Sequence, residues 1–435
     1  MEFGSGRILL ASAVCLAALL VYFFGEKVVL ARRRRSVPLR ICVTGTRGKS
    51  TVTRLLAAVL REAGYRVLAK TTGSKPVLIL PDGSECEIAR RGRPSILEQR
   101  GVLRRASRLR ADAVVAEMMS IRGESLRAEA NAIFRPALLL VTNVRLDHLD
   151  DMGRTKEAIA STLAEAIPYG ARVFVPESEA YPVFAETARA RRTEIVRLSR
   201  AALVTSATTV TRATMPAPAA PPEAEGSRTG PSTMQVPSST TVPSPADEFP
   251  DNLRLVEAAA ASLGIGPSVI ASGLAKARPD FGSLRVWRAP AAEGCAPLFL
   301  ASAFAANEPE SSALVLAALR RRYPSLPAKT VGLLNLRADR NDRTRQWLRA
   351  IQDGFFDSFE RLVFIGDHTR ALARLARAGQ LTRIPAVGLV ERDPDRIMSR
   401  LRALIPEESL VLGLGNIGGP GGALVEHWSR TGASF

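Results

Sequence analysis

The sequence predicts an α/β protein with two domains that follow one transmembrane helix. An uncharged apolar stretch runs from Ile8 to Phe24, close to the N-terminus. Beyond it, short apolar runs alternate with amphipathic helical patterns in two successive blocks, and this alternation is typical of mostly parallel sheets covered by helices. A segment rich in Pro, Ala, Ser and Thr, residues 205–250, interrupts the first block.

The apolar stretch predicts a membrane anchor. Its 17 residues are at the short end of what spans a hydrocarbon core of about 30 Å, and Val28 to Ala31 extend it, so we assign residues 8–31 to the anchor. Arg32 to Arg35 follow, against a single Arg7 before it, and the positive-inside rule therefore places the N-terminus outside the cell membrane and the rest of the chain in the cytoplasm. A cleaved signal peptide is the alternative, but its positive charge belongs on the other flank.

The net charge of +18 is compatible with nucleic acid, an anionic membrane surface or an acidic substrate. An arginine-rich composition without a binding role is the alternative. Proteins that bind single-stranded nucleic acid combine basic grooves with aromatic stacking platforms, but aromatic residues make up only 5% of this chain. We therefore expect no nucleic acid, and we expect Arg32–Arg35 to contact anionic lipids.

The first block predicts a sheet whose strands are separated by helices. A helix is expected from Ser50 to Ala63, and two more at residues 252–263 and 267–276. Residues 205–250 hold almost no large apolar side chains, so we expect a disordered insertion there. The expected strands are residues 40–44, 66–71, 111–118, 136–143 and 171–175.

The second block predicts a further α/β domain. Its expected strands are residues 298–304, 330–335, 361–366, 384–389 and 409–414, and its expected helices are residues 310–322, 344–355, 369–378 and 395–404. A literal G-x-G-x-x-G starts at Gly413, but only 17 residues follow Gly418. That length leaves no room for the acidic ribose ligand of a dinucleotide-binding fold, so we do not expect NAD.

A glycine-rich turn follows the first expected strand and leads directly into a helix. Such a turn presents backbone N–H groups and the positive end of the helix dipole to phosphate oxygens. Lys49 then reaches the β and γ phosphates, and the Ser50 hydroxyl is placed for Mg²⁺. A glycine turn used only for helix packing is the alternative, and Val43 stands where the full Walker pattern has its first glycine. The expected nucleotide contacts are Gly45, Thr46, Arg47, Gly48, Lys49, Ser50 and Thr51.

Two further segments carry residues suited to this site. Glu117 ends a buried strand, where a carboxylate at the C-terminal edge of a parallel sheet meets a ligand at the turn. The loop after Asn143 brings His148 among three aspartates. A solvated strand end for Glu117 and a loop cap for His148 are the alternatives, since Mg²⁺ prefers oxygen ligands.

These motifs occur in an order that resembles a known family. G-T-R-G-K-S-T, the strand-terminal Glu117 and T-N-V-R-L-D-H-L-D-D-M-G resemble the Mur ligases and folylpolyglutamate synthetases, which are ATP-dependent amide-bond ligases. The resemblance implies a Mur-ligase-like ATP-binding domain over residues 38–285 and a C-terminal Rossmann-like α/β ligase domain over residues 286–435. It also implies that Glu117 and His148 hold divalent ions, Mg²⁺ or alternatively Mn²⁺, that Asn307 contacts adenine and that Asp339 contacts the ribose. Loop caps are the alternative for Asn307 and Asp339.

Longer strings narrow the resemblance to the ligase subunits of poly-γ-glutamate synthases. These strings are K-T-T-G-S (70–74), R-R-G-R-P-S-I-L-E-Q (90–99), E-M-M (117–119), F-A-A-N-E-P-E-S (304–311), D-R-N-D-R (339–343) and G-N-I-G-G-P-G (415–421). The resemblance implies a ligase that polymerises glutamate through an acyl phosphate, with glutamate, the growing polymer and small integral-membrane subunits as partners. It leaves open whether the chain forms a homo-oligomer.

The chain departs from the Mur pattern at two positions. Thr162 lies where those ligases carry a carbamylated lysine, and Arg285 is only an approximate substitute for the arginine of their P-G-R-x-E segment. Two alternative functions stay open. Nothing in the sequence names the amino acid that is accepted, which leaves a ligase for another amino acid, and the net charge of +18 leaves a P-loop ATPase acting on nucleic acid.

Overall fold

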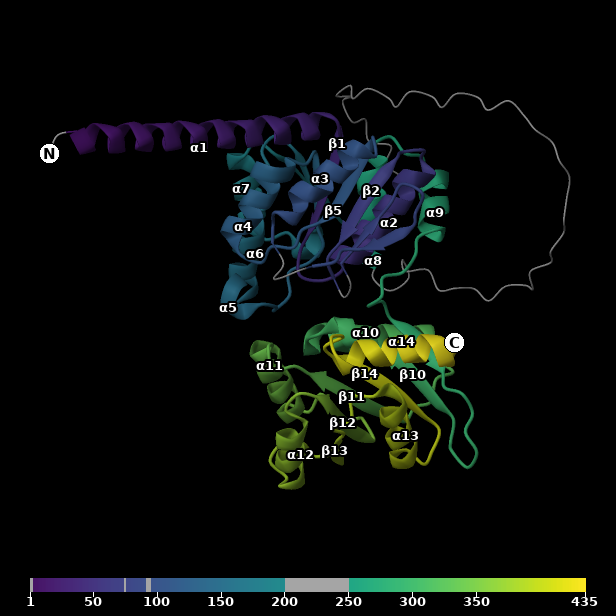
Figure 1. Cartoon of the computed structure of the whole chain (residues 1–435). Coiled ribbons are helices and arrows are strands. Elements are labelled where there is room, and N and C mark those ends of the chain that lie inside the picture. The colour runs from purple at the N-terminus through teal and green to yellow at the C-terminus, as the bar shows by residue number, and fades with distance from the viewer. Residues whose placement is uncertain (1–2, 74–75, 91–94, 200–249) are drawn as a thin grey trace, which may run out of the picture.

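The computed structural model describes residues 3–73, 76–90, 95–199 and 250–435. These residues form a long N-terminal helix and two α/β domains, each built on one sheet, which are stacked one above the other (Figure 1). The insertion expected at residues 205–250 lies, except for Pro250, outside the described residues, as do Ser74 and residues 91–94 of the motifs named above. The two sheets confirm the predicted α/β class.

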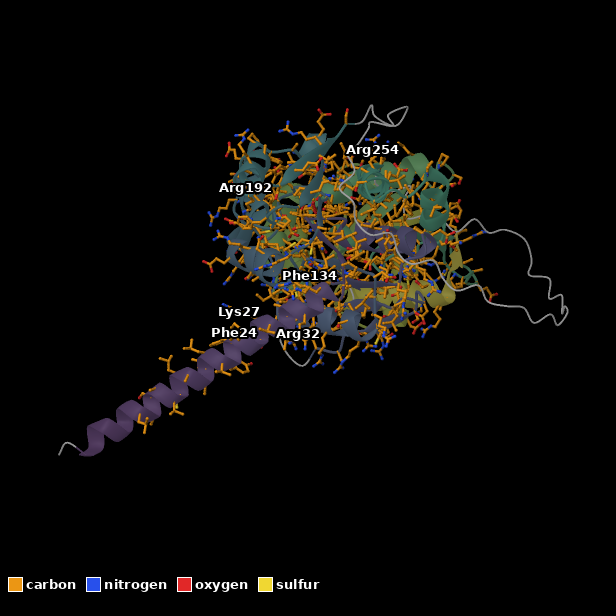
Figure 2. The ribbon with its side chains drawn as sticks, turned by 90° about the horizontal axis from the view of Figure 1, so that it is seen from above. Phe24, Lys27, Arg32, Phe134, Arg192 and Arg254 are labelled. Atoms are coloured by element: carbon orange, nitrogen blue, oxygen red, sulfur yellow. The ribbon has the colours of Figure 1, made fainter. Side chains whose placement is uncertain are left out.

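Helix α1 (Phe3–Arg35) runs away from the body as a single rod, with Lys27 and Arg32 near its base (Figure 2). Its stretch Leu10–Arg35 is apolar and long enough to cross a membrane, and no part of that stretch's apolar window is buried by protein. The last turns pack against the body. Arg100 on α3 (Glu98–Arg108) pairs with Glu26 at 2.9 Å, and Arg34 donates to the carbonyl oxygen of Ala132 at 2.7 Å.

The first sheet has the strand order β4-β3-β2-β5-β1-β6-β7-β8. Pairing is parallel from β2 to β8, and the short strands β3 and β4 close one edge in antiparallel pairing. The strands are β1 (Leu39–Thr44), β2 (Val67–Thr71), β3 (Val77–Ile79), β4 (Glu85–Glu87), β5 (Ala113–Glu117), β6 (Leu138–Val141), β7 (Arg172–Pro176) and β8 (Glu194–Leu198).

Both faces of this sheet are covered, because successive side chains of a strand point to opposite faces. Ile41 and Val43 of β1 pack in the core below α2 (Lys49–Glu62), α8 (Pro250–Ala261) and α9 (Pro267–Ala275), whereas Cys42 packs in the core of the other face. That second face is covered by α3, α4 (Gly123–Arg127), η1 (Ala128–Phe134), α5 (Leu149–Met152), α6 (Lys156–Ala164) and α7 (Pro182–Ala190), with η2 (Glu177–Glu179) after β7.

The second sheet has the order β13-β12-β11-β14-β10-β9-β15, parallel from β13 to β10, with β9 and β15 antiparallel at the edge. Its strands are β9 (Arg285–Arg288), β10 (Leu298–Ser302), β11 (Thr330–Leu336), β12 (Arg361–Gly366), β13 (Ala386–Gly388), β14 (Ser409–Gly415) and β15 (Ala433–Ser434). Its helices are η4 (Phe304–Ala306), α10 (Pro309–Arg322), α11 (Asn341–Gln352), α12 (Thr369–Arg377), α13 (Pro394–Leu404) and α14 (Pro420–Thr431).

The expected long elements are present, with shifted ends. Helix α11 occupies residues 341–352 instead of the expected 344–355, because Gly354 adopts a left-handed φ of 86° that ends the helix before the aromatic cluster of Phe355 and Phe356. The short edge strands β3, β4, β8, β9 and β15 were not predicted, since two to five residues carry too little periodicity.

Candidate active site

The turn after β1 depends on two glycines. Gly45 has φ 120° and Gly48 has φ 79°, which side chains other than glycine rarely adopt. An added Cβ would lie 2.2 Å from Thr142 Oγ1 at Gly45 and 2.6 Å from Asn252 Nδ2 at Gly48. The chain can therefore bend sharply here, and α2 begins at Lys49. The backbone N–H groups of the first turn of α2 have no partner within the helix, and they lie next to the glycine-rich loop.

Lys49 is folded against this turn. Its Nζ donates to the carbonyl oxygens of Gly45 at 2.7 Å and Thr46 at 3.2 Å. Burial lowers the pKa of the Lys49 ammonium, although the nearby charges of Glu117 and Asp147 oppose this shift. The ammonium group is thus held at the glycine turn by neutral acceptors and nearby carboxylates.

Ser50 and Glu117 are in direct contact. Ser50 Oγ donates to Glu117 Oε2 at 2.7 Å, and the backbone N–H of Thr72 donates to the same oxygen at 2.7 Å. Glu117 is only 3% exposed. Strand β5 pairs in parallel with both β1 and β2, so the last residue of β5 lies between the two segments that follow those strands. A hydroxyl and a carboxylate oxygen side by side are hard ligands of the kind that Mg²⁺ and Mn²⁺ accept.

His148 lies at the start of α5, in a left-handed conformation with φ 49°. Its Nε2 is 3.7 Å from Asp147 Oδ2. Burial lowers the pKa of the imidazole, against the raising effect of Asp147, which favours the neutral ring with a free lone pair. In the part of the chain that the structure describes, no three His, Cys, Asp or Glu side chains form a metal-binding group.

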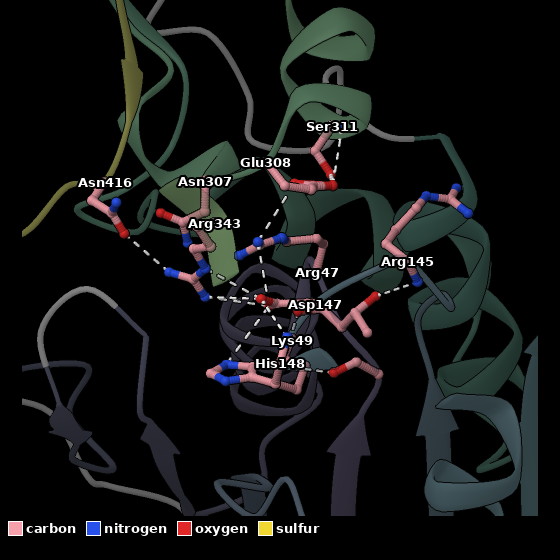
Figure 3. Close-up of polar contacts among 12 residues, drawn as sticks. Arg47, Lys49, Arg145, Asp147, His148, Asn307, Glu308, Ser311, Arg343 and Asn416 are labelled. Carbon is pink, nitrogen blue, oxygen red and sulfur yellow. Dashed lines mark hydrogen bonds and ion pairs between the residues drawn. The ribbon is translucent and has the colours of Figure 1, made fainter. Parts of the chain in front are cut away.

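Asp147 links the two domains. Arg343 on α11 donates to Asp147 Oδ1 from Nη2 at 3.0 Å and from Nε at 3.2 Å, and Arg47 Nη2 lies 3.3 Å from Asp147 Oδ2 (Figure 3). Burial raises the pKa of this carboxyl, but the two guanidinium groups outweigh burial and hold the pKa well below its usual range. Asp147 is therefore a carboxylate shared by one arginine from each domain.

Arg47 also reaches the second domain directly. Its Nη2 lies 3.5 Å from Glu308 Oε2, and Glu308 in turn accepts from the backbone N–H of Ser311 at the start of α10. Arg145 adds a second bridge, with Glu179 at 2.7 Å and Glu310 at 3.8 Å. The P-loop side of the first sheet and the start of α10 thus face each other through charged groups.

The two residues expected to hold adenosine are placed differently. With its amide oriented so that both ends are satisfied, Asn307 accepts from Arg47 Nη1 at 2.7 Å and donates to the carbonyl oxygens of Gly415 and Phe304. Asp339 instead pairs with Arg337 at 2.7 Å at the exposed surface and does not line the cavity between the domains. The structure brings Asn307 to the P-loop and leaves Asp339 outside.

A cavity of about 790 Å³ lies between the two domains. It is lined by the P-loop residues Gly45 to Thr51, Glu117 with the loop that follows it, and His148, and from the second domain by Asn307, Arg343 and Asn416. The expected residues other than Asp339 therefore line one cavity.

Several residues of this site were not assigned a role from the sequence. Asp147 and Arg343 lie inside motifs in which other residues were assigned roles, and Glu308 is next to Asn307. Their position in or beside a motif was the only feature of the sequence that could have indicated a role. The two departures from the Mur pattern have structural partners. Thr162 donates to the carbonyl oxygen of Met152 at 2.9 Å, and the Arg285 guanidinium lies 5.4 Å over the Trp287 ring.

Known protein families share this arrangement. The family model "Mur ligase middle domain" matches residues 43–214, and "Poly-gamma-glutamate synthase CapB C-terminal domain" matches residues 289–431. Together the two matches cover most of the chain. The chain thus matches the Mur ligases in its first domain and the CapB-type poly-γ-glutamate synthases in its second, and full-length CapB proteins are its relatives. It is accordingly an ATP-dependent ligase.

Relatives match along almost the whole length. The chain is 29% identical to the capsule biosynthesis protein CapB of Bacillus anthracis, over 95% of this chain and 81% of the relative. It is 27% identical to the PGA synthase CapB of Bacillus subtilis (strain 168), over 92% of this chain and 93% of the relative.

Two solved structures share the fold. E. coli FolC in complex with DHPP and ADP aligns with a TM-score of 0.55 at 17% identity, covering 92% of this chain and 91% of that chain. The bifunctional folylpolyglutamate synthase/dihydrofolate synthase of Yersinia pestis, complexed with AMPPNP and Mn ion, aligns with a TM-score of 0.59 at 15% identity, covering 95% of this chain and 97% of that chain.

Proposed function

We propose that this CapB-type ligase is anchored in the membrane and joins glutamate units into poly-γ-glutamate, using ATP. The observation that carries the proposal is the contact of Ser50 with Glu117 beside Lys49, in a cavity that the CapB-type domain closes from the other side. These residues supply a phosphate-binding turn, two hard oxygen ligands and a surplus of positive charge in one place. Such a site suits phosphoryl transfer between ATP and a carboxylate.

In this proposal ATP binds with its phosphates at the residues Gly45 to Thr51. The N–H groups at the start of α2 and the Lys49 ammonium would stabilise the phosphate charges. Asn307 would meet the nucleotide base from the second domain, because its amide already lies against the P-loop at Arg47. Asp339 would reach the ribose only after its ion pair with Arg337 opens.

The donor set fits a hard divalent ion, Mg²⁺ or alternatively Mn²⁺. Ser50 and Glu117 would hold it through oxygen, and His148 would act as a further ligand through its neutral imidazole. When bound, the ion would neutralise charge on the phosphate and carboxylate oxygens. Thr162, whose hydroxyl is bonded to Met152, supplies no carbamate to this site.

The reaction proceeds in two balanced steps. First, a carboxylate oxygen of the glutamyl chain forms a bond to the γ-phosphorus of ATP while the bond from that phosphorus to the ADP oxygen breaks, which gives an acyl phosphate and ADP. Then the amine nitrogen of an incoming glutamate forms a bond to the acyl carbon, inorganic phosphate leaves, and the amine gives up a proton. The protein holds two anions together and needs no covalent nucleophile of its own.

The anchor places this chemistry at the membrane. We propose that α1 spans the cell membrane with its N-terminus outside, because Arg32 to Arg35 follow the apolar segment on the side of the catalytic domains. The same arginines would contact anionic lipids. Small integral-membrane subunits are the expected partners that move the polymer outward, and nucleic acid is not an expected partner. Sedimentation measurements would test whether the chain associates with itself.

The test uses the full chain in membranes with ATP, Mg²⁺ and labelled D- or L-glutamate. Lys49→Ala is expected to lower glutamate-dependent ADP release and polymer formation by at least about 100-fold, because a charge that stabilises the transferring phosphoryl group is lost. The matched control is Lys276→Ala, which removes an exposed lysine that pairs with Glu62 at 2.7 Å and should keep normal activity. Polymer synthesis at the normal rate by Lys49→Ala would refute the proposal.

The alternative functions have distinct outcomes in the same assay. ADP release that responds to a different amino acid, with an amide product, identifies a ligase for that amino acid. ADP release that responds to nucleic acid, without any ligase product, identifies a nucleic-acid-dependent ATPase.

A further inference from the structure

The charged side chains that line the cavity between the domains are mostly cationic. Four acidic residues line it, Glu117, Asp147, Asp151 and Asp280. Against them stand eight cationic residues: Arg47, Lys49, Arg90, Arg122, Arg145, Arg337, Arg340 and Arg343. A polymer with one carboxylate on each unit is a polyanion, and such an excess of positive charge would favour its binding.

Arg122 differs from the other lining arginines in its exposure. Its side chain is 75% exposed, whereas those of Arg47 and Arg343 are 17% and 8% exposed. Its ion pair with Asp151 at 2.9 Å lies at the surface, where ion pairs are weak and easily exchanged for another anion. Arg122 therefore lies at the mouth of the cavity, where its guanidinium group is accessible to a carboxylate of a ligand.

The loop that carries Arg122 is fixed relative to Glu117. Buried Glu129 accepts hydrogen bonds from the backbone N–H groups of Met119 and Ser120, both at 3.2 Å, and from Ser120 Oγ at 2.7 Å. Gln99 connects Glu129 to the carbonyl oxygen of Glu117, which it reaches at 3.3 Å. The position of Arg122, five residues after Glu117, is thus supported by a buried network.

The mouth at Arg122 lies on the same side of the first sheet as the membrane anchor. Leu126 of α4 and Met152 of α5 belong to one core, and Leu30 of α1 packs against that core. The opposite face of the sheet is covered by α2, α8 and α9. In Figure 1, α4 and α5 lie on the side of the domain from which α1 projects.

We propose that Arg122 binds a carboxylate of the growing γ-glutamyl chain, some units away from the reacting end, so that the polymer leaves the cavity between α4 and α5 toward the membrane. This inference rests on the proposed function. A bidentate guanidinium contact suits a side-chain carboxylate of the polymer. Arg122 is then a residue that sets affinity for the polymer and not for ATP.

The experiment measures initial rates of the full-length protein in membranes with a γ-glutamyl oligomer as acceptor. Arg122→Gln is expected to raise the KM for the oligomer about tenfold, the loss of one charge-assisted contact, while the KM for ATP stays within about twofold. Arg122→Lys should recover part of the affinity, because the charge returns without the planar fork. Product chains of Arg122→Gln should also be shorter, because the polymer dissociates earlier.

The matched control is Arg127→Gln. Arg127 is the last residue of helix α4, which begins directly after Arg122; its side chain is 58% exposed, pairs with Glu165 at 2.7 Å and does not line the cavity. An unchanged KM for the oligomer in Arg122→Gln, or an equal rise in Arg127→Gln, would overturn the inference. Either result leaves the proposed function standing as long as the wild type makes polymer and Lys49→Ala does not, whereas a wild type that makes none removes both.

Discussion

Arg343 of the second domain and Asp147 of the first form a buried, hydrogen-bonded ion pair, with Arg343 Nη2 3.0 Å from Asp147 Oδ1. The two residues are 196 positions apart in the chain. Asp147 precedes the proposed metal ligand His148, and Arg343 also donates to Asn416 at 3.1 Å. This pair therefore couples the arrangement of the two domains to the groups that surround the phosphate-binding turn.

Replacing Arg343 by alanine should weaken the contact between the two domains. Removal of one partner from a buried ion pair costs several kcal/mol, although Arg47 remains beside Asp147. We expect kcat/KM for ATP to fall on the order of 100-fold and the radius of gyration in solution scattering to increase. Arg345→Ala, on an exposed position of the same helix, is the control and should change neither. Equal kinetics for the two variants would show that the pair does not contribute to closure.

Gly73→Ala should disturb the proposed metal site without replacing any of its ligands. An added Cβ at Gly73 would lie 2.6 Å from Ser50 Oγ, so the hydroxyl must move away from Glu117. We expect the Mg²⁺ concentration for half-maximal activity to rise about tenfold. Gly101→Ala is the control, since its Cβ meets nothing within 4 Å and should stabilise helix α3 by about 0.5–1 kcal/mol. The same Mg²⁺ dependence in both variants would argue against Ser50 as a ligand.

Glu85 should make the stability of the first domain depend on pH. Hydrogen bonds from the buried Arg54, at 2.5 and 3.0 Å, lower the pKa of Glu85. Because the folded protein releases this proton more readily than the unfolded chain, the contact adds to the free energy of unfolding above about pH 4.5 and is lost as the pH falls below that value.

Glu85→Gln should therefore lower the melting temperature by a few degrees at pH 7, a loss on the order of 1 kcal/mol, and the difference from wild type should be smaller at pH 3. Thermal unfolding of the detergent-solubilised chain measures this. Glu87→Gln, exposed on the same short strand, is the control and should match wild type at both pH values. A difference between wild type and Glu85→Gln that is as large at pH 3 as at pH 7 would contradict the assignment.

The arginines after the apolar segment should set the orientation of the anchor. In the triple variant Arg32→Gln, Arg33→Gln and Arg35→Gln, Arg34 is kept because it bonds to Ala132. We expect a measurable minority of chains to insert in the reverse orientation or not at all, since each arginine favours the inner side by about 1 kcal/mol. Protease added outside sealed cells should digest the catalytic domains of that minority only. A triple replacement on α3, at Arg104, Arg105 and Arg108, should leave them fully protected.

Much of the fold follows from local pattern. Apolar runs such as Val114 to Ala116 are buried on both sides, which is why their composition alone predicted central parallel strands. The sequence also predicted that Ser50 and Glu117 lie close together, because residues at the carboxyl ends of adjacent parallel strands lie at one edge of a sheet. The strands of two to five residues at the sheet edges could not be predicted from local pattern, because their pairing depends on partners far along the chain.

The sequence by itself determined the glycine turn before Lys49, the strand-terminal Glu117 and the apolar N-terminal helix, since each is a pattern of neighbouring residues with a local physical cause. Only the tertiary structure decided that Arg343 meets Asp147, that Asn307 lies against Arg47, and that Asp339 points to solvent beside Arg337. The first two contacts depend on how the two sheets are packed against each other. No local periodicity records that packing, because charge pairing across an interface is set by geometry and not by spacing in the chain.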